Sequence, residues 1–415
     1  MTDQLHRGAA PDAARLDAAD PLADRRALFH LPEGLIYLDG NSLGPLPKGV
    51  AERVAATVST EWGGSLIRGW NAHGWMDLPD RVGDRIGRLI GAAPGSVTVG
   101  DSTSVNLFKA LAAAVAMRPE RAVILSDDGN FPTDLYMAEG LNGLRGRGRL
   151  KLVPRAEIAE AIDADTAVVM LTEVDYRTGH KADMAAVTAK AHAAGAVMVW
   201  DLAHSTGAFP VDLTASGAEF AVGCGYKYLN GGPGAPAFLY VRPDLAGEAV
   251  PALSGWLGHA APFAFEPAYR PAEGAARMRV GTPPILSLSA LDAALDAFEG
   301  VDMALVREKS VALAELFISE VARLAPMGSL TLVSPPAAAR GSQVSYRHAQ
   351  GYAVMQALIA EGVIGDFRAP DVMRFGFAPL YLRFTDVAEA ALRLADILSS
   401  GRWDRPAFHA RAKVT

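Results

Sequence analysis

Short apolar runs alternate with alanine-rich stretches through the middle of the chain. The runs are rich in valine, isoleucine, leucine and phenylalanine and cover residues 97–99, 122–125, 167–171, 196–200, 220–224 and 237–241. Runs of this kind are typical of strands that are buried on both faces, and the stretches between them suit helices. The pattern therefore predicts an α/β fold in which helices cover a mostly parallel sheet.

The pattern changes after about residue 290, where long helical stretches such as residues 303–325 become dominant. We interpret residues 61–290 as a large domain and residues 291–415 as a smaller α+β domain. Residues 1–60 are expected to join the smaller domain. A chain of 415 residues is long enough for two such units.

Composition and charge narrow the range of partners. The formal net charge is −7, and no part of the chain carries a block of basic residues. Neither a nucleic acid nor an anionic membrane surface is therefore expected as a partner. Residues 1–29 lack the apolar core of a signal peptide, and the apolar stretch at 110–117 is far shorter than a membrane span. We expect a cytoplasmic protein that binds a small molecule.

Cys224 is the only cysteine of the chain. A single cysteine cannot form an intramolecular disulfide framework or a paired-cysteine metal or redox site, so no metal centre is expected. This cysteine content suits a reducing compartment.

One aspartate and one lysine stand where a single cofactor can use both. Residues 185–194 read as a helix that ends at Gly195, which places Asp201 at the carboxyl end of the following strand, where open α/β sheets bind ligands. Lys227 follows 26 residues later in a glycine-flanked segment. Pyridoxal phosphate requires an amine that forms a Schiff base and a carboxylate that keeps its pyridinium nitrogen protonated. The alternative is a surface lysine and a helix-capping aspartate.

Such a site also needs a phosphate cradle and a ring stack. Residues 101–106 leave a strand and open an apolar helix, so they can bind a phosphate, although ordinary N-capping also accounts for them. Phe131 follows the next strand and either stacks on a pyridine ring or belongs to the core. His204 either touches the cofactor or is a core histidine. Tyr226 can donate to the phosphate or act as a proton donor.

Arg374 is a lone charge within an apolar segment. Because an unpaired buried guanidinium is costly, Arg374 needs a carboxylate partner. That partner is either an internal aspartate or the carboxylate of a substrate.

Longer segments are more specific than these single residues. They are YLDGNSLG at 37–44, FPTD at 131–134, WDLAH at 200–204, YKYLN at 226–230, SGWLGH at 254–259 and RFGFAPLY at 374–381. Together they resemble kynureninase, a pyridoxal-phosphate hydrolase, and the resemblance extends from about residue 31 to residue 398. It implies fold type I of the pyridoxal-phosphate enzymes, with a seven-stranded type of sheet in the large domain.

The resemblance implies a role for each matching residue. Lys227 forms the Schiff base with pyridoxal phosphate, Asp201 pairs with the pyridinium nitrogen, and Phe131 stacks on the ring. The other implied cofactor contacts are Pro132, Thr133, Asp134, Thr172 and His204 around the ring, and Thr103, Ser104 and Tyr226 at the phosphate. The implied substrate-binding residues are Arg374, at the α-carboxylate of the amino acid, Asn41 and Ser42.

Trp256 and Thr282 are implied to reach the phosphate site of a neighbouring subunit. The active unit is therefore expected to be a homodimer with shared active sites. Thr282 stands where some members of the family have asparagine, and either residue can donate a hydrogen bond.

The implied activity is hydrolysis of the Cβ–Cγ bond of L-kynurenine or 3-hydroxykynurenine in tryptophan catabolism and NAD precursor formation. The products are anthranilate or 3-hydroxyanthranilate, and L-alanine. Lys227 is expected to act as the base at the α-proton, and Tyr226 as the proton donor in later steps. The sequence leaves both substrates open.

Other functions compete with this one. A class V aminotransferase shares the Asp201 and Lys227 segments, but it releases a keto acid and pyridoxamine phosphate. A cysteine desulfurase needs a mobile cysteine well after the lysine, whereas Cys224 precedes Lys227 by three residues. A non-catalytic cofactor-binding regulator is disfavoured, because all the candidate catalytic residues are present and no basic DNA-binding patch is visible.

Overall fold

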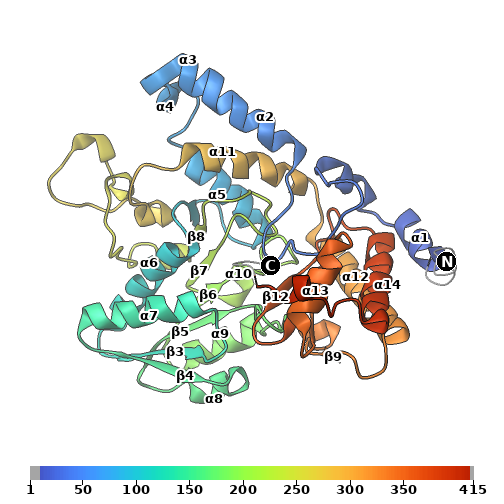
Figure 1. The fold of residues 1–415 in the computed structure, drawn as a ribbon. Helices are drawn as coiled ribbons and strands as arrows, with labels where there is room; N and C mark the ends of the chain where they lie inside the picture. Colours follow the sequence, from blue (N-terminus) through green and yellow to red (C-terminus); the bar gives the residue numbers. More distant parts are fainter. Residues whose placement is uncertain (1–9, 412–415) are drawn as a thin grey trace.

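The computed structural model describes residues 10–411 and is built around a seven-stranded sheet with the strand order β2-β8-β7-β6-β5-β3-β4 (Figure 1). The strands are β2 (Val97–Val99), β3 (Val123–Asp127), β4 (Arg149–Val153), β5 (Thr166–Thr172), β6 (Val197–Asp201), β7 (Phe220–Gly223) and β8 (Phe238–Val241). The strands from β4 to β7 run parallel, and β8 is antiparallel to both of its neighbours. The predicted α/β class and mostly parallel sheet are confirmed.

Both faces of the sheet are buried, which explains its unbroken apolar runs. In β5, Val168 and Met170 belong to the buried cluster that includes α6 (Thr103–Ala116). Val169 and Leu171 belong to the separate cluster on the opposite face. Because successive side chains of a strand point to opposite faces, all the interior positions of β5, from Ala167 to Leu171, are apolar.

The apolar runs did not predict β4, which lies at the edge of the sheet. Its sequence, RLKLV, alternates charged and apolar residues, and none of its residues is fully buried. Edge strands commonly carry charged side chains, because an uncharged edge invites pairing with another chain.

Helices flank this sheet on both sides (Figure 1). Those that pack on its strands are α5 (Leu78–Leu89), α6, α7 (Pro132–Arg145), α8 (Ile158–Ala161) and α9 (Met184–Ala193). The other helices of this part of the chain are α2 (Lys48–Ala56), α3 (Gly63–Ser65), α4 (Gly69–Ala72), α10 (Leu213–Ser216) and α11 (Ile285–Ala294). Within residues 10–411, none of the helices has the length and hydropathy needed to cross a membrane.

The C-terminal part forms a second, smaller layer of strands and helices. Its antiparallel sheet has the order β12-β13-β10-β9, and its elements are α12 (Met303–Leu324), β9 (Thr331–Leu332), β10 (Gln343–Arg347), α13 (Gly351–Ala360), β11 (Val363–Ile364), β12 (Asp366–Arg368), β13 (Val372–Gly376), α14 (Phe384–Ser400) and α15 (Pro406–His409). From the N-terminal segment, α1 (Ala10–Ala18) packs on α14, and β1 (Ile36–Tyr37) pairs with β11. In contrast, α2 packs on α11. The limits of the two domains stay a prediction.

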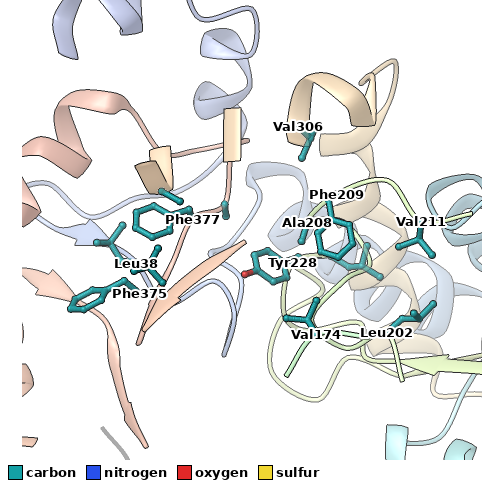
Figure 2. Close-up of a cluster of buried hydrophobic side chains, with 14 of the residues drawn as sticks. Leu38, Val174, Leu202, Ala208, Phe209, Val211, Tyr228, Val306, Phe375 and Phe377 are labelled. Atoms are coloured by element: carbon teal, nitrogen blue, oxygen red, sulfur yellow. The ribbon is translucent and has the colours of Figure 1, made fainter. Parts of the chain in front are cut away.

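A continuous apolar core joins the two parts of the molecule. Figure 2 shows Tyr228 between Leu38 and Phe377 on one side and Phe209 on the other. The Tyr228 hydroxyl donates to the backbone oxygen of Ser342 at 3.1 Å. This packing fixes the C-terminal part against the end of the large sheet where its parallel strands finish.

Candidate active site

A cavity of about 160 Å³ lies at the carboxyl ends of β5 and β6. Its lining residues come from the strand ends and from the loops and helices that follow them: Ser102, Thr103, Ser104, Phe131, Thr133, Asp134, Thr172, Tyr176, Asp201, Ala203, His204, Tyr226 and Lys227. The structure thus brings most of the predicted cofactor residues together at the edge of the sheet where open α/β folds bind ligands.

Local structure explains how these side chains converge. Thr172 and Asp201 are the last residues of the adjacent strands β5 and β6, and they are partners in the register. Lys227 lies in the loop after β7, and its Nζ is 3.0 Å from His204 Nε2. Burial and the nearby Lys227 charge lower the pKa of His204 well below its ordinary value. His204 is therefore neutral, and its Nε2 accepts a hydrogen bond from the Lys227 amine in this contact.

Asp134 and Asp201 form a buried pair of carboxyl groups. Burial, followed by the charge of Asp201, raises the pKa of Asp134 well above its ordinary value. Burial also raises the pKa of Asp201, but the charge of Lys227 and a 2.7 Å hydrogen bond from the backbone nitrogen of Ala203 favour its ionised form. We therefore assign the shared proton to Asp134 and the negative charge to Asp201.

The beginning of α6 provides an anion site. Ser102 caps the helix by accepting a hydrogen bond from the Val105 backbone nitrogen at 3.3 Å, as ordinary capping requires. Thr103 and Ser104, in the first turn, also line the cavity. The free amide groups and hydroxyls of this turn can hold a phosphate.

The aromatic wall of the cavity is made by two residues. Phe131 packs edge-on against Tyr176, with 5.4 Å between the ring centroids. Pro132 is exposed at the first position of α7 and does not line the cavity. Sequence reasoning missed Tyr176, although its place shortly after the end of β5 is the signal that could have found it.

Arg374 has an internal aspartate as its partner. It is 1% exposed, its Nε donates to Asp366 Oδ1 at 2.6 Å, and its Nη2 donates to Asp366 Oδ2. Its Nη1 donates to the backbone oxygen of Tyr176, and its Nη2 also donates to Ser42 Oγ at 3.1 Å. Neither Arg374, Ser42 nor the fully buried Asn41 lines the cavity. Arg374 is therefore separated from the cavity by Tyr176, to whose backbone it donates a hydrogen bond.

Trp256 and Thr282 lie away from the cavity of their own chain. Trp256 is 41% exposed and packs edge-on against Phe263, with 5.7 Å between the ring centroids. Thr282 lines a separate hollow together with Asp101 and Lys109. The structure therefore does not bring these two residues to the Lys227 cavity within one chain.

The residues of the cavity fit pyridoxal phosphate. Asp134 Oδ2 and His204 Nδ1 are buried polar atoms without a partner in the described part of the chain. Asp201 supplies the negative charge that a pyridinium nitrogen needs, Lys227 supplies the amine, and the first turn of α6 supplies the anion site. The sheet and these residues together define a pyridoxal-phosphate enzyme of fold type I.

Solved structures share this fold. The cystine C–S lyase C-DES, in a mutant with glycine covalently linked to the PLP cofactor, matches with a TM-score of 0.77 and 19% identity over 89% of this chain and 99% of that one. A cysteine desulfurase from Thermococcus onnurineus matches with a TM-score of 0.75 and 18% identity over 91% of this chain and 98% of that one. Here, Cys224 is buried and precedes the lysine, unlike the mobile cysteine expected of a desulfurase.

Sequence relatives define the particular family. The family model of the kynureninase C-terminal domain matches residues 306–394. Kynureninase from Pseudomonas fluorescens is 52% identical over 97% of this chain and 99% of its own length. Kynureninase from Deinococcus radiodurans is 56% identical over 92% of this chain and 95% of its own length. The chain belongs to the kynureninase family.

Proposed function

We infer that this chain is a pyridoxal-phosphate-dependent hydrolase that cleaves the Cβ–Cγ bond of L-kynurenine, or of its 3-hydroxy derivative, in tryptophan catabolism. The products are anthranilate, or 3-hydroxyanthranilate, and L-alanine. The observation that carries this function is the identity of 51% or more to kynureninases over nearly the full chain. The convergence of Lys227, Asp201 and the α6 anion site in one cavity supports it.

Each group of residues has a distinct task in holding the cofactor. Asp201 faces the pyridinium nitrogen, Thr103 and Ser104 bind the phosphate, and Phe131 stacks on the ring. Bound there, pyridoxal phosphate supplies an electron sink that weakens the bonds at the substrate's α and β carbons. Thr172, Thr133 and His204 complete the wall.

Proton transfer is assigned to Lys227 and Tyr226. The Lys227 amine is the base for the α-proton, and the neutral His204 at 3.0 Å orients it. Burial raises the pKa of the Tyr226 phenol above its ordinary value. The phenol therefore stays protonated at neutral pH and can donate its proton to the carbon released by cleavage.

Arg374, Asn41 and Ser42 are proposed to form the substrate side of the site. Arg374 donates to the backbone oxygen of the cavity-lining residue Tyr176. A substrate carboxylate that extends beyond Tyr176 would therefore contact the Arg374 guanidinium. Ser42 contacts the same guanidinium at 3.1 Å. Asn41, directly before Ser42, lies against the backbone of Gly376.

We propose that the protein is a cytoplasmic homodimer in which Trp256 and Thr282 complete the partner's phosphate site. The support is a group of exposed aromatic side chains, in which Phe263 packs against both Trp256 and Phe265. Exposed aromatic groups of this kind are typical of subunit interfaces.

The experiment that tests the function is product analysis. The purified protein with pyridoxal phosphate is incubated with L-kynurenine and, separately, with 3-hydroxykynurenine. Equimolar L-alanine and the matching aromatic acid are expected. A keto acid with pyridoxamine phosphate would instead identify an aminotransferase, and the absence of any turnover with an intact cofactor spectrum would support a non-catalytic protein.

A further inference from the structure

A second cavity, of about 480 Å³, begins one residue beyond the Lys227 cavity. Thr172, the last residue of β5, lines the first cavity, and the next residue, Glu173, lines the second. The two cavities share no lining residue. The other acids of the second cavity, Asp183 and Asp212, are exposed and cap the helices α9 and α10. None of the functions proposed above uses this cavity.

Glu173 is the buried acid of the second cavity. It is 4% exposed, and its Oε2 is buried without a hydrogen-bond partner in the part of the chain that the structure describes. Burial raises the pKa of Glu173 from 4.5 to about 7. The groups that oppose this shift are Ser205, Lys181, Arg155 and Arg307. None of these three cations lies within the 4.0 Å of an ion pair, so a bound ammonium group would stabilise the ionised form of Glu173.

Lys181 is a half-buried base of the same cavity. Its Nζ lies 5.7 Å from the centroid of the Phe209 ring and has no hydrogen-bond or ion-pair partner among residues 10–411. Arg307, which packs on the same ring, instead donates to the backbone oxygen of Ala337 at 2.7 Å. Lys181 and Glu173 are therefore two opposite charges on one cavity wall, each without an ion-pair partner.

A ligand that satisfies both groups must carry both charges. The ammonium group of an α-amino acid can donate to the Glu173 carboxylate, and its carboxylate can accept from the Lys181 ammonium. A simple anion would leave Glu173 without a partner, and a simple amine would leave Lys181 without one. The buried side chains of Met184 and Val211 also line the cavity and suit an apolar ligand side chain.

We propose that this second cavity binds a small α-amino acid with an apolar side chain, with its ammonium group on Glu173 and its carboxylate on Lys181. The inference does not rest on the proposed function, because the Lys227 cavity contributes no residue to this site.

The first test is calorimetric titration of L-leucine, at pH 8, into holoenzyme whose Schiff base has been reduced with borohydride. Reduction fixes the cofactor to Lys227, so added L-leucine cannot form a Schiff base in the first cavity. One saturable site per chain is expected. Glu173→Gln and Lys181→Met should each weaken this binding roughly tenfold or more, since each removes a charged hydrogen bond. The controls are Glu157→Gln and Lys190→Met, which change exposed residues outside the cavity and should bind like the parent.

The second test compares matched ligands and needs no variant in its first step. L-Leucinamide lacks the carboxylate, and 4-methylpentanoate lacks the ammonium group. Both should bind the parent roughly tenfold or more weakly than L-leucine. Lys181→Met should then leave L-leucinamide binding unchanged, and Glu173→Gln should not weaken 4-methylpentanoate binding.

Three results would overturn the proposal. The first is the absence of saturable L-leucine binding at millimolar concentrations. The second is L-leucine binding that folded Glu173→Gln and Lys181→Met both retain, because the ligand then sits elsewhere. The third is equal affinity of the parent for L-leucine and 4-methylpentanoate, which would identify a site for a simple anion.

Discussion

A shared proton on the Asp134–Asp201 pair sets the chemistry of the cavity at the scale of single residues. The neutral member can be replaced by an amide at little cost, whereas the charged member cannot.

Single residues also show most clearly what could not be predicted from the sequence. The motifs identified Lys227 and Asp201, because both lie in short, distinctive segments near strand ends. They did not pair Arg374 with Asp366, since that contact depends on the register of β12 and β13.

Asp134→Asn and Asp201→Asn should therefore differ sharply. Asn is close in shape to a protonated aspartate, so Asp134→Asn is expected to lower kcat/KM less than about tenfold. Asp201→Asn removes the negative charge that the pyridinium nitrogen needs and is expected to lower kcat/KM by roughly 100-fold or more. Both are measured by steady-state kinetics at saturating cofactor. Equal losses in the two variants would contradict the assignment of the proton to Asp134.

Glu173 predicts a pH dependence of stability. It is 4% exposed, and burial raises its pKa from 4.5 to about 7, against the opposing effects of Ser205 and Lys181. The folded state thus keeps a proton that the unfolded chain loses above pH 4.5. The free energy of unfolding therefore falls as the pH rises from about 4.5 to 7, by about 3 kcal/mol in total.

Glu173→Gln should remove this component. In urea unfolding, the variant is expected to be more stable than the parent at pH 8 by roughly 1 to 3 kcal/mol, with a much smaller difference at pH 5. Glu157→Gln is the matched control, because Glu157 is an exposed glutamate on the same part of the molecule. A difference between Glu173→Gln and the parent that does not change between the two pH values would refute this account.

Helices and strands are the part of the site that could be predicted well from the sequence. Buried strands such as β5 and β6 are recognisable as apolar runs, so their carboxyl ends, with Thr172 and Asp201, could be placed from the sequence alone. The edge strand β4 could not, because its solvent-facing side lacks that run. Tyr176 could not be assigned either, since a loop acquires its geometry from the elements that pack around it.

The beginning of α6 depends on a buried lysine of the same helix. Asp101, just before the helix, has a φ of +54°. Lys109 Nζ donates a hydrogen bond to Asp101 Oδ2 at 2.9 Å. Lys109 Nζ also donates to the Met278 backbone oxygen at 2.8 Å. Lys109→Met should therefore release the segment that positions Thr103 and Ser104, and lower pyridoxal phosphate affinity roughly tenfold or more.

Equilibrium dialysis of the cofactor measures this effect. Loss of the ion pair, in which Lys109 is buried and Asp101 is partly exposed, should also lower the free energy of unfolding by roughly 1 to 3 kcal/mol. The double variant Lys109→Met with Asp101→Asn, which removes both charges, should recover part of that stability without recovering cofactor affinity. Lys190→Met, at an exposed position of α9, is the control. Unchanged cofactor affinity in folded Lys109→Met would separate Lys109 from the anion site.

At the scale of the whole molecule, the site is a product of two packed parts. The core around Tyr228 joins the end of the large sheet to the C-terminal layer, so the Lys227 loop and the Arg374 strand keep a fixed relation (Figure 2). Trp256 and Thr282 do not line the Lys227 cavity of their own chain. Both are exposed, and Trp256 packs against the exposed Phe263 on a surface that a second subunit would cover.

The protein is therefore expected to be a dimer in light scattering at assay concentration. Trp256→Ala should lower cofactor affinity roughly tenfold. The melting temperature of the protein should stay unchanged, because Trp256 is 41% exposed and packs against Phe263. Tyr136→Ala is the control, since Tyr136 is 62% exposed on α7 and lies outside the apolar group around Trp256. If Trp256 acts across the interface, mixing Trp256→Ala chains with inactive Lys227→Ala chains at a limiting cofactor concentration should restore activity, because each mixed dimer then holds one site with neither substitution. A fully active monomer, or mixed dimers that recover nothing, would show that each cavity works within its own chain.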